Sequence, residues 1–296
     1  MPPTLGRGVE LSLAGLAIWG DDRLFAPFSF WPAHYRPFLS TGSARPVDAR
    51  FVLGSPARRP AEAGFVASFS TSAVQFGTVG PRRVYRFRVS GSPAYLMAEA
   101  DEHHGQIEMW PDGDGSGGLP PWSQPVDRVL CIGVLAHRRA VIVHSCGWIG
   151  HGRALLFPGV SGAGKTTLCR QLLASGQGQV ISDDRVVVRH SPEGFRAWGT
   201  PWPGDARQAL NASAPLAAMC FIEKTPEHRL RPIRPTDAFR RLLQTAGVPW
   251  YSPALRDRVL PVLEELVAAV PAFSLGFRPS RDVVDCLLPL VGGSVP

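Results

Sequence analysis

An apolar run that ends in a glycine-rich turn is the feature that most constrains the fold of this 296-residue chain. Residues 155–157 are Leu-Leu-Phe, and residues 159–166 fit the pattern G-x-x-x-x-G-K-[ST]. A spacing of leucines typical of a helix follows, at Leu168, Leu172 and Leu173. The sequence therefore predicts a strand, a phosphate-binding loop and a helix in that order, which is the context in which this pattern binds phosphate.

Each residue type in the predicted loop suits phosphate binding. Glycines let successive backbone N–H groups turn toward phosphate oxygens, and the new helix directs its positive dipole end at the same anion. We expect the Lys165 ammonium to reach the β- and γ-phosphates and the Thr166 hydroxyl to help hold Mg²⁺. The expected nucleotide-binding residues are Gly159, Val160, Ser161, Gly162, Ala163, Gly164, Lys165, Thr166 and Thr167.

Lysine usage favours this interpretation over a glycine-rich turn that happens to precede a helix. The chain has 31 lysine and arginine residues, and only Lys165 and Lys224 are lysines. A composition that uses arginine almost everywhere keeps a lysine at the motif position, where a flexible ammonium is needed rather than a planar guanidinium.

The basic composition raises the question of nucleic-acid binding. The net charge is +7 and the pI is near 9.6. The arginines are spread in short pairs such as Arg58-Arg59 and Arg240-Arg241, and no RNA- or DNA-binding signature accompanies them. We therefore expect affinity for phosphorylated or acidic small partners and no nucleic-acid partner.

Cysteine usage and hydropathy favour a cytoplasmic protein. Five cysteines without a C-x-x-C pair indicate neither a disulfide framework nor a zinc site, which fits a reducing compartment. The N-terminus lacks a basic segment followed by a long apolar core, and no stretch approaches about 20 apolar residues. We expect a soluble chain with no membrane partner.

Two regions are expected from the pattern along the chain. Residues 1–125 carry short β-like runs at 9–16, 65–69, 83–89, 95–98 and 106–110, separated by turn residues. This β-rich N-terminal region has no catalytic signature and is a candidate for acceptor recognition. A proline- and glycine-rich connector at 111–125 marks the expected boundary, and residues 126–296 form the expected catalytic domain.

The second region begins with a helical segment, 126–137, and an apolar run, 140–143, that ends at His144. A hairpin turn is expected at 147–152, before the strand that enters the loop. After the loop helix, a short strand at 179–182 leads into two aspartates. Helices are expected at 237–245, 259–270 and 282–288, and a hairpin at 186–198.

Asp183 and Asp184 are the second group of candidate residues. A strand–helix–strand crossover is right-handed and brings the carboxyl ends of its strands to one side, where ligands bind. One carboxylate there can hold Mg²⁺ and the other can take a proton from an attacking hydroxyl. The alternative is that one or both aspartates only cap a turn before Arg185.

The order of these residues resembles the catalytic domain of HPr kinase/phosphorylase and its HPr-kinase-like relatives, which include lasso-peptide precursor kinases. The resemblance covers residues 126–200 and is carried by the loop at 159–167, by Asp183-Asp184-Arg185-Val186 and by His144 upstream of the loop. The second signature of true HPr kinase is not recognisable, so the likeness is to the relatives rather than to HPr kinase itself.

The resemblance implies an α/β fold with a P-loop core of the HPr kinase and phosphoenolpyruvate carboxykinase type. It implies an ATP- and Mg²⁺-dependent kinase that phosphorylates a hydroxyl, serine above all, of a peptide or small protein in peptide natural-product modification. A homo-oligomer is a further implication. The candidate catalytic residues are Asp183, Asp184, His144 and Lys165, and the candidate metal ligands are Thr166 and Asp184.

Three questions stay open at the level of sequence. The chain could be a nucleotide-dependent peptide-binding or regulatory subunit with weak NTPase activity, or a kinase of a small metabolite. His144 could contact the acceptor or an aspartate, or could be a core residue of its strand. Arg185 could stabilise transferring charge or pair with a neighbouring aspartate.

Overall fold

The computed structural model describes residues 8–24, 31–40, 46–88, 95–111, 122 and 124–292. It has a mixed α/β fold with two large mixed sheets and few helices. The chain divides into two compact units, which are described one at a time. The N-terminal unit comprises Met1–Pro32, Leu39–His137 and Trp250–Pro253, and the C-terminal unit comprises Ala33–Phe38, Arg138–Pro249 and Ala254–Pro296.

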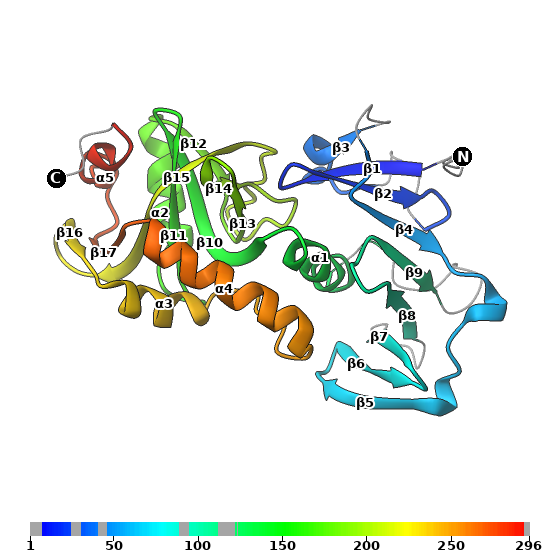
Figure 1. The fold of residues 1–296 in the computed structure, drawn as a ribbon. Helices are drawn as coiled ribbons and strands as arrows, with labels where there is room; N and C mark the ends of the chain where they lie inside the picture. The colour runs from blue at the N-terminus through cyan, green and yellow to red at the C-terminus, as the bar shows by residue number, and fades with distance from the viewer. Residues whose placement is uncertain are drawn as a thin grey trace. The chain divides into compact units, whose positions relative to one another are not determined.

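The N-terminal unit contains a nine-stranded sheet in the order β3-β1-β2-β4-β9-β8-β7-β6-β5 (Figure 1). Its pairs are antiparallel except β2–β4 and β4–β9, which are parallel. The strands are β1 (Gly8–Leu13), β2 (Leu16–Asp21), β3 (Leu39–Ser40), β4 (Ala49–Leu53), β5 (Phe65–Ser70), β6 (Val74–Val79), β7 (Arg82–Arg88), β8 (Tyr95–Ala100) and β9 (Gln106–Trp110).

The strand expected at 9–16 is a hairpin. Ala14 and Gly15 adopt positive φ angles of 53° and 74°, which turn the chain between β1 and β2. Helix α1 (Val126–Ala136) belongs to this unit, so the units divide after His137 instead of at residue 125. There α1 packs closely on His104, since a Cβ on Gly133 would lie 2.1 Å from that ring. Most of the connector at 111–125 lies outside the described residues.

The C-terminal unit is built on a second sheet with the path β11-β10-β13-β14-β15-β17-β16, in which β12 pairs with β10 and β11 also pairs with β15. Its strands are β10 (Ala140–Gly150), β11 (Arg153–Pro158), β12 (Gln179–Ser182), β13 (Arg185–Ser191), β14 (Gly194–Trp198), β15 (Ser213–Lys224), β16 (Arg229–Pro232) and β17 (Ala272–Phe277). Its helices are α2 (Lys165–Ser175), α3 (Pro235–Leu243), α4 (Pro253–Ala269) and α5 (Val283–Val291).

Strand directions bring four carboxyl ends together. Strands β11, β15 and β17 are mutually parallel, and β12 runs the same way because β11 and β12 are both antiparallel to β10. The expected crossover is confirmed in this respect. Ligands bind at the carboxyl ends of such strands, so the loop after β11, the segment after β12 and the end of β15 are the places to look for a site.

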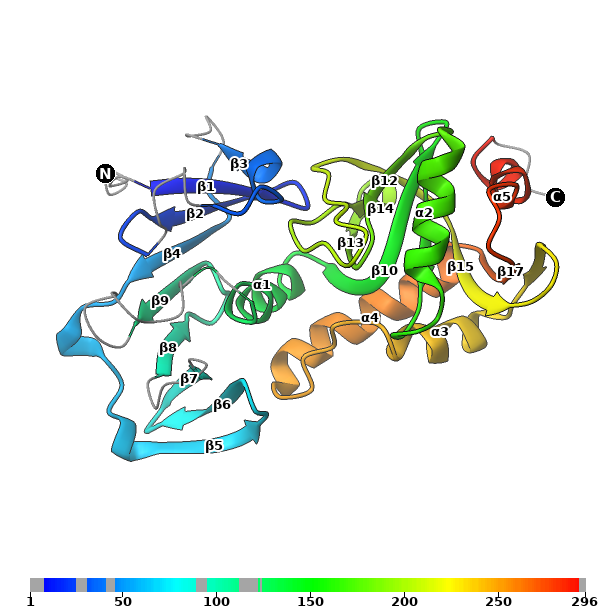
Figure 2. The same ribbon diagram turned by 180° about the vertical axis from the view of Figure 1, so that it is seen from behind.

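Helices α2 and α5 cover one face of this sheet, and α3 and α4 lie on the other side (Figures 1 and 2). The leucines Leu168 and Leu172 of α2 are buried in a core cluster with Trp148, Phe157 and Leu287. This cluster packs α2 against β10 and β11, the strand pair that leads into the glycine loop. The first turn of α2 is therefore held rigidly at the edge where the carboxyl ends meet.

Several boundaries differ from the expectation. The hairpin turn expected at 147–152 is wrong in extent, since β10 continues to Gly150 and only His151 and Gly152 turn. A Cβ on Gly147 would lie 2.9 Å from Ile181 and Val186 side chains, so this glycine permits close packing within a strand. Helix α4 begins at Pro253, earlier than expected. The hairpin at 186–198 is confirmed as β13 and β14.

None of the helices among the described residues has the length and apolar character needed to cross a membrane.

Candidate functional site

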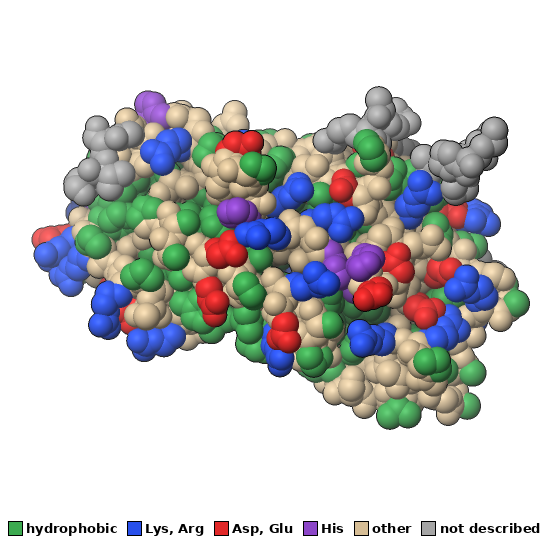
Figure 3. Space-filling model, viewed as in Figure 1, with side chains coloured by type: hydrophobic (Ala, Val, Ile, Leu, Met, Phe, Trp, Pro, Cys, Tyr) green, Lys and Arg blue, Asp and Glu red, His purple; other side chains and the backbone are tan. Residues whose placement is uncertain are grey.

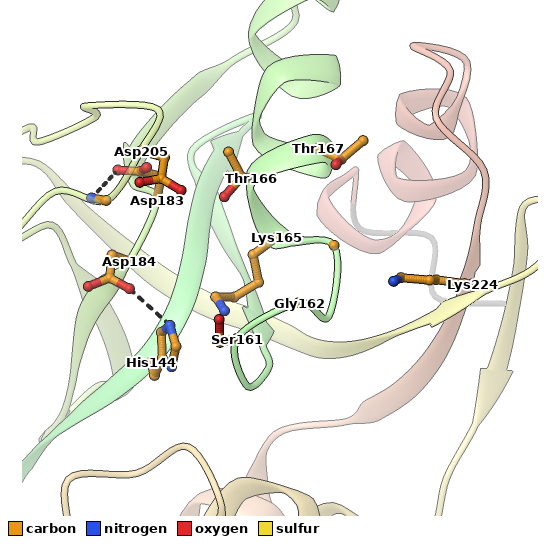
Figure 4. Close-up of a pocket in the computed structure, with 12 residues that line it drawn as sticks. His144, Ser161, Gly162, Lys165, Thr166, Thr167, Asp183, Asp184, Asp205 and Lys224 are labelled. Atoms are coloured by element: carbon orange, nitrogen blue, oxygen red, sulfur yellow. Dashed lines mark hydrogen bonds and ion pairs between the residues drawn. The ribbon is translucent and has the colours of Figure 1, made fainter.

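A polar cavity of 520 Å³ opens where the carboxyl ends of β11, β12 and β15 meet. Twelve residues line it, and all belong to the C-terminal unit (Figure 4). They are His144, Ser161, Gly162, Gly164, Lys165, Thr166, Thr167, Asp183, Asp184, Gly204, Asp205 and Lys224. The cavity thus joins the loop residues and the aspartates that the sequence singled out.

The loop between β11 and α2 depends on its glycines. Gly162 and Gly164 have φ angles of 80° and 103°, which other L-residues rarely adopt. Gly164 is the N-cap of α2, and its carbonyl accepts the first helical hydrogen bond from the Leu168 N–H at 2.9 Å. Gly159 is close to the other end of the loop, since a Cβ there would lie 2.9 Å from that of Ala163. The first turn of α2 consequently faces the cavity.

Three of the nine expected loop residues, Gly159, Val160 and Ala163, are not among the lining residues. Two of them act through their backbone. The Lys165 ammonium donates hydrogen bonds to the carbonyl oxygens of Gly159 at 2.7 Å and Val160 at 3.0 Å. These bonds close the loop around the lysine side chain and hold its ammonium beside the cavity.

Lys165 is 7% exposed, and burial lowers the pKa of its ammonium. The negative charge of Asp184 acts in the opposite direction, and the positive charge of Arg185 lowers the pKa further. A largely buried cation that is held by two neutral carbonyls is favourably placed to gain an anionic ligand.

The side chains of His144 and Asp184 lie next to each other in the wall of the cavity. The Nε2 atom of His144 lies 2.9 Å from Oδ1 of Asp184, and the Arg185 guanidinium donates to the same oxygen at 2.9 Å. Each of the three side chains is about a quarter exposed, so they are open to a ligand. The structure thus answers one open question, because His144 contacts an aspartate.

The backbone of β10 fixes this arrangement at the point where the strand changes partners. It pairs with β13 up to His144 and with β11 from Ser145 onward. The Gly159 N–H donates to the His144 carbonyl at 3.2 Å, and the Ser145 N–H donates to the Asp184 carbonyl at 3.0 Å. Two adjacent residues of one strand therefore hold the glycine loop on one side and the aspartate segment on the other.

Asp183 has a different environment from Asp184. It is 2% exposed, and its carboxylate accepts hydrogen bonds from the backbone N–H groups of Gly204, Ala206 and Gln208 at 2.9, 2.7 and 3.0 Å. These residues belong to the loop 199–210, hereafter the rim loop. Asp183 lines the cavity and at the same time anchors this loop.

The rim loop packs closely on the end of β12. The Leu210 N–H donates to the Ile181 carbonyl at 3.0 Å, and a Cβ on Gly199 would lie 1.9 Å from the Leu210 carbonyl oxygen. A Cβ on Gly204 would lie 3.0 Å from both Asp183 Oδ2 and Asp184 Cβ. The rim loop forms one wall of the cavity through Gly204 and Asp205.

Lys224 and Asp205 are lining residues that the sequence interpretation did not assign to the site. Lys224 is the last residue of β15, at the sheet edge where ligands bind. The chain has two lysines, and both line this one cavity. No local pattern marks Asp205.

Oxygen donors for a magnesium ion are present on one side of the loop. Thr166 and Asp184 line the same cavity, and Figure 4 shows Thr166 on the side of α2 that faces the aspartates. No group of three His, Cys, Asp or Glu residues within the described part of the chain is arranged to hold a metal alone. Mg²⁺ commonly takes one or two protein oxygens together with phosphates and water, so this donor set fits it.

Charge on the face of the molecule drawn in Figure 3 is mixed. On the face drawn in Figure 3, the lysine and arginine side chains of each unit are interspersed with aspartate and glutamate. The positive charge that matters for the site is local, namely that of Lys165, Lys224 and Arg185.

A search of protein-family models finds no family that matches the chain, and a search of curated proteins finds no matching protein.

Proposed function

We propose that the chain is an ATP- and Mg²⁺-dependent phosphotransferase that phosphorylates a hydroxyl, namely that of a serine in a peptide or small protein. The proposal includes a P-loop core of the HPr kinase and phosphoenolpyruvate carboxykinase type and a cytoplasmic location. One observation carries it. The buried ammonium of Lys165, the first turn of α2 and the His144–Asp184 pair converge on one polar cavity.

The phosphate-binding part of the proposal rests on the loop. Backbone N–H groups at the start of α2 and the Lys165 ammonium bind the β- and γ-phosphates, and the ammonium exchanges its loop carbonyls for phosphate oxygens. Thr166 and Asp184 would provide protein oxygens for Mg²⁺, and the ion would neutralise charge on the phosphates. Positioning and charge neutralisation supply most of the catalysis in phosphoryl transfer.

The acceptor hydroxyl is proposed to lie beside His144 and Asp184. Its oxygen forms a bond to the γ-phosphorus, the bond from that phosphorus to the β–γ bridging oxygen breaks, and ADP leaves. The hydroxyl proton passes to the imidazole of His144, which lies 2.9 Å from Asp184 Oδ1 and is oriented by it. Asp183 is a weaker candidate for this proton, because three backbone N–H groups already occupy its carboxylate.

The test is intact-mass spectrometry of hydroxyl-bearing peptides and metabolites incubated with the protein, ATP and Mg²⁺. A phosphate-sized mass gain that is lost in Asp184→Asn and kept in the distant surface variant Glu193→Gln would support the kinase. If nucleotide binds but no acceptor in a panel that includes serine peptides is labelled, the kinase proposal fails and the nucleotide-dependent binding subunit takes its place.

A further inference from the structure

A second hollow adjoins the polar cavity on the opposite side of the glycine loop from His144 and Asp184. Its volume is 370 Å³, and its lining is Gly164, Thr167, Lys224, Thr225, Pro226, Phe277 and Pro279. Gly164, Thr167 and Lys224 line both spaces, so the two are continuous. Figure 4 shows Thr167 and Lys224 on the side of the loop away from the aspartates. We call this space the apolar hollow.

The walls of the apolar hollow come from the ends of two parallel strands. Lys224 of β15 is paired with Phe277 of β17, and the Thr225 N–H donates to the Phe277 carbonyl at 3.2 Å. The Thr225 hydroxyl donates to the Glu227 carbonyl at 2.7 Å and shapes the turn that carries Pro226. The hollow is therefore built by the sheet itself.

The chemistry of the hollow differs from that of the polar cavity. Its lining contains no carboxylate, and the rings of Pro226, Phe277 and Pro279 supply flat apolar surface. Pro226 and Pro279 are exposed, so their faces are accessible to a ligand. Such a space suits a planar apolar group that is joined to an anion lying beside Lys224 and the start of α2.

We propose, on the basis of the proposed function, that the apolar hollow binds the nucleobase and ribose of the nucleotide whose phosphates occupy the polar cavity. Lys224 stands at the border of the two spaces and neutralises the phosphate nearest the ribose. The nucleotide then runs from Pro226 and Pro279 past Lys224 to Lys165, and its γ-phosphate ends beside Asp184.

The acceptor is the competing occupant, and the geometry disfavours it. An acceptor hydroxyl must reach the γ-phosphate next to His144 and Asp184, which lie across the loop from the hollow (Figure 4). A molecule seated on Pro226 and Pro279 would meet the opposite end of the phosphate chain.

The experiment compares the affinities of ATP and inorganic tripolyphosphate by titration calorimetry, both with Mg²⁺. The variant is Pro226→Asn/Pro279→Asn, which keeps the charge and removes apolar surface. The matched control is Pro192→Asn/Pro232→Asn, two exposed prolines of the same unit that line neither space. Lys165→Met serves to test the phosphate site.

We expect the wild-type protein to bind ATP at least about tenfold more tightly than tripolyphosphate, because only ATP buries a base. The hollow variant should lose most of that difference and keep its affinity for tripolyphosphate, whereas the control should keep both. Equal affinity of the wild-type protein for ATP and tripolyphosphate would overturn the inference about the apolar hollow but would leave the proposed phosphate site standing. If neither ligand binds, or if Lys165→Met changes nothing, the proposed function fails as well.

Discussion

His144 and Asp184 lie 2.9 Å apart although His144 belongs to β10 and Asp184 to the bend between β12 and β13. The backbone carbonyl of His144 also holds the glycine loop. The position of the imidazole is therefore coupled to that of the glycine loop. In phosphoryl transfer, such coupling sets the geometry between the acceptor hydroxyl and the γ-phosphate.

The first prediction concerns His144. Replacing it with Gln should lower kcat for acceptor phosphorylation by about 10²-fold or more, the usual contribution of a positioned acid–base group. Nucleotide affinity should change little, because the backbone carbonyl that holds Gly159 remains. Steady-state kinetics and calorimetry together check this. A loss of nucleotide affinity equal to the loss of kcat would show that the imidazole only supports the fold.

The second prediction separates the two aspartates. Asp183→Asn should lower the free energy of unfolding by about 2 to 4 kcal/mol, because hydrogen bonds to a buried carboxylate are lost from the rim loop. Asp184→Asn should change it by less than about 1 kcal/mol, since partly exposed ion pairs contribute little.

Urea denaturation followed by tryptophan fluorescence measures both values. Asp184→Asn provides the matched control, since it makes the same chemical change one residue away. Equal stability of the two variants would contradict the anchoring role of Asp183.

The third prediction uses the lowered pKa of Lys165. Between the lowered pKa of the folded state and the ordinary value of 10.5, the unfolded chain binds more protons, so stability from this group rises with pH. Below that window the charged lysine opposes folding. Lys165→Met should therefore be as stable as the wild-type protein or more stable at pH 7, and the difference should shrink toward pH 10.

Nucleotide affinity of Lys165→Met at pH 7 should nevertheless fall at least about 100-fold, because the ammonium that binds the phosphates is missing. Paired denaturation curves at pH 7 and pH 10 measure the stability difference. If Lys165→Met were less stable than the wild-type protein at pH 7, the charged lysine would stabilise the folded state and the burial argument would be refuted.

The sequence was sufficient to predict those elements whose structure depends on residues within their own segment. The glycine loop, α2, β12 and the β13–β14 hairpin follow from motif, periodicity and turn residues within each segment. It failed at Gly147 and Gly150, which resemble turn glycines but lie within β10. The need for glycine at 147 comes from the Ile181 and Val186 side chains that the tertiary fold brings in, and at 150 from the ring of Trp148 on the same strand.

The site residues also divide into those that the local sequence predicts and those that it does not. The loop, the two aspartates and a division of roles between them were predictable from the motif and the strand order. What was not predictable is the difference in environment by which Asp183 anchors a loop and Asp184 stays open to a ligand. That difference depends on backbone N–H groups of the rim loop, more than twenty residues downstream. Lys224 required knowledge that β15 lies parallel to β11, which no local pattern encodes.

The fourth prediction concerns the rim loop itself. Gly199→Ala would place a Cβ 1.9 Å from the Leu210 carbonyl and 2.6 Å from that of Ile181, both of them backbone atoms. Because neither can move without disturbing the bond that joins Leu210 to β12, we expect a loss of about 3 kcal/mol in unfolding free energy. Gly292→Ala is the matched control, with φ of −81° and its nearest atom at 3.4 Å. Gly199→Ala should also weaken acceptor phosphorylation by shifting Asp205 and Gly204, while the control leaves the rate unchanged. If Gly199→Ala matched the control in both stability and rate, the rim loop would not be held against β12 as described.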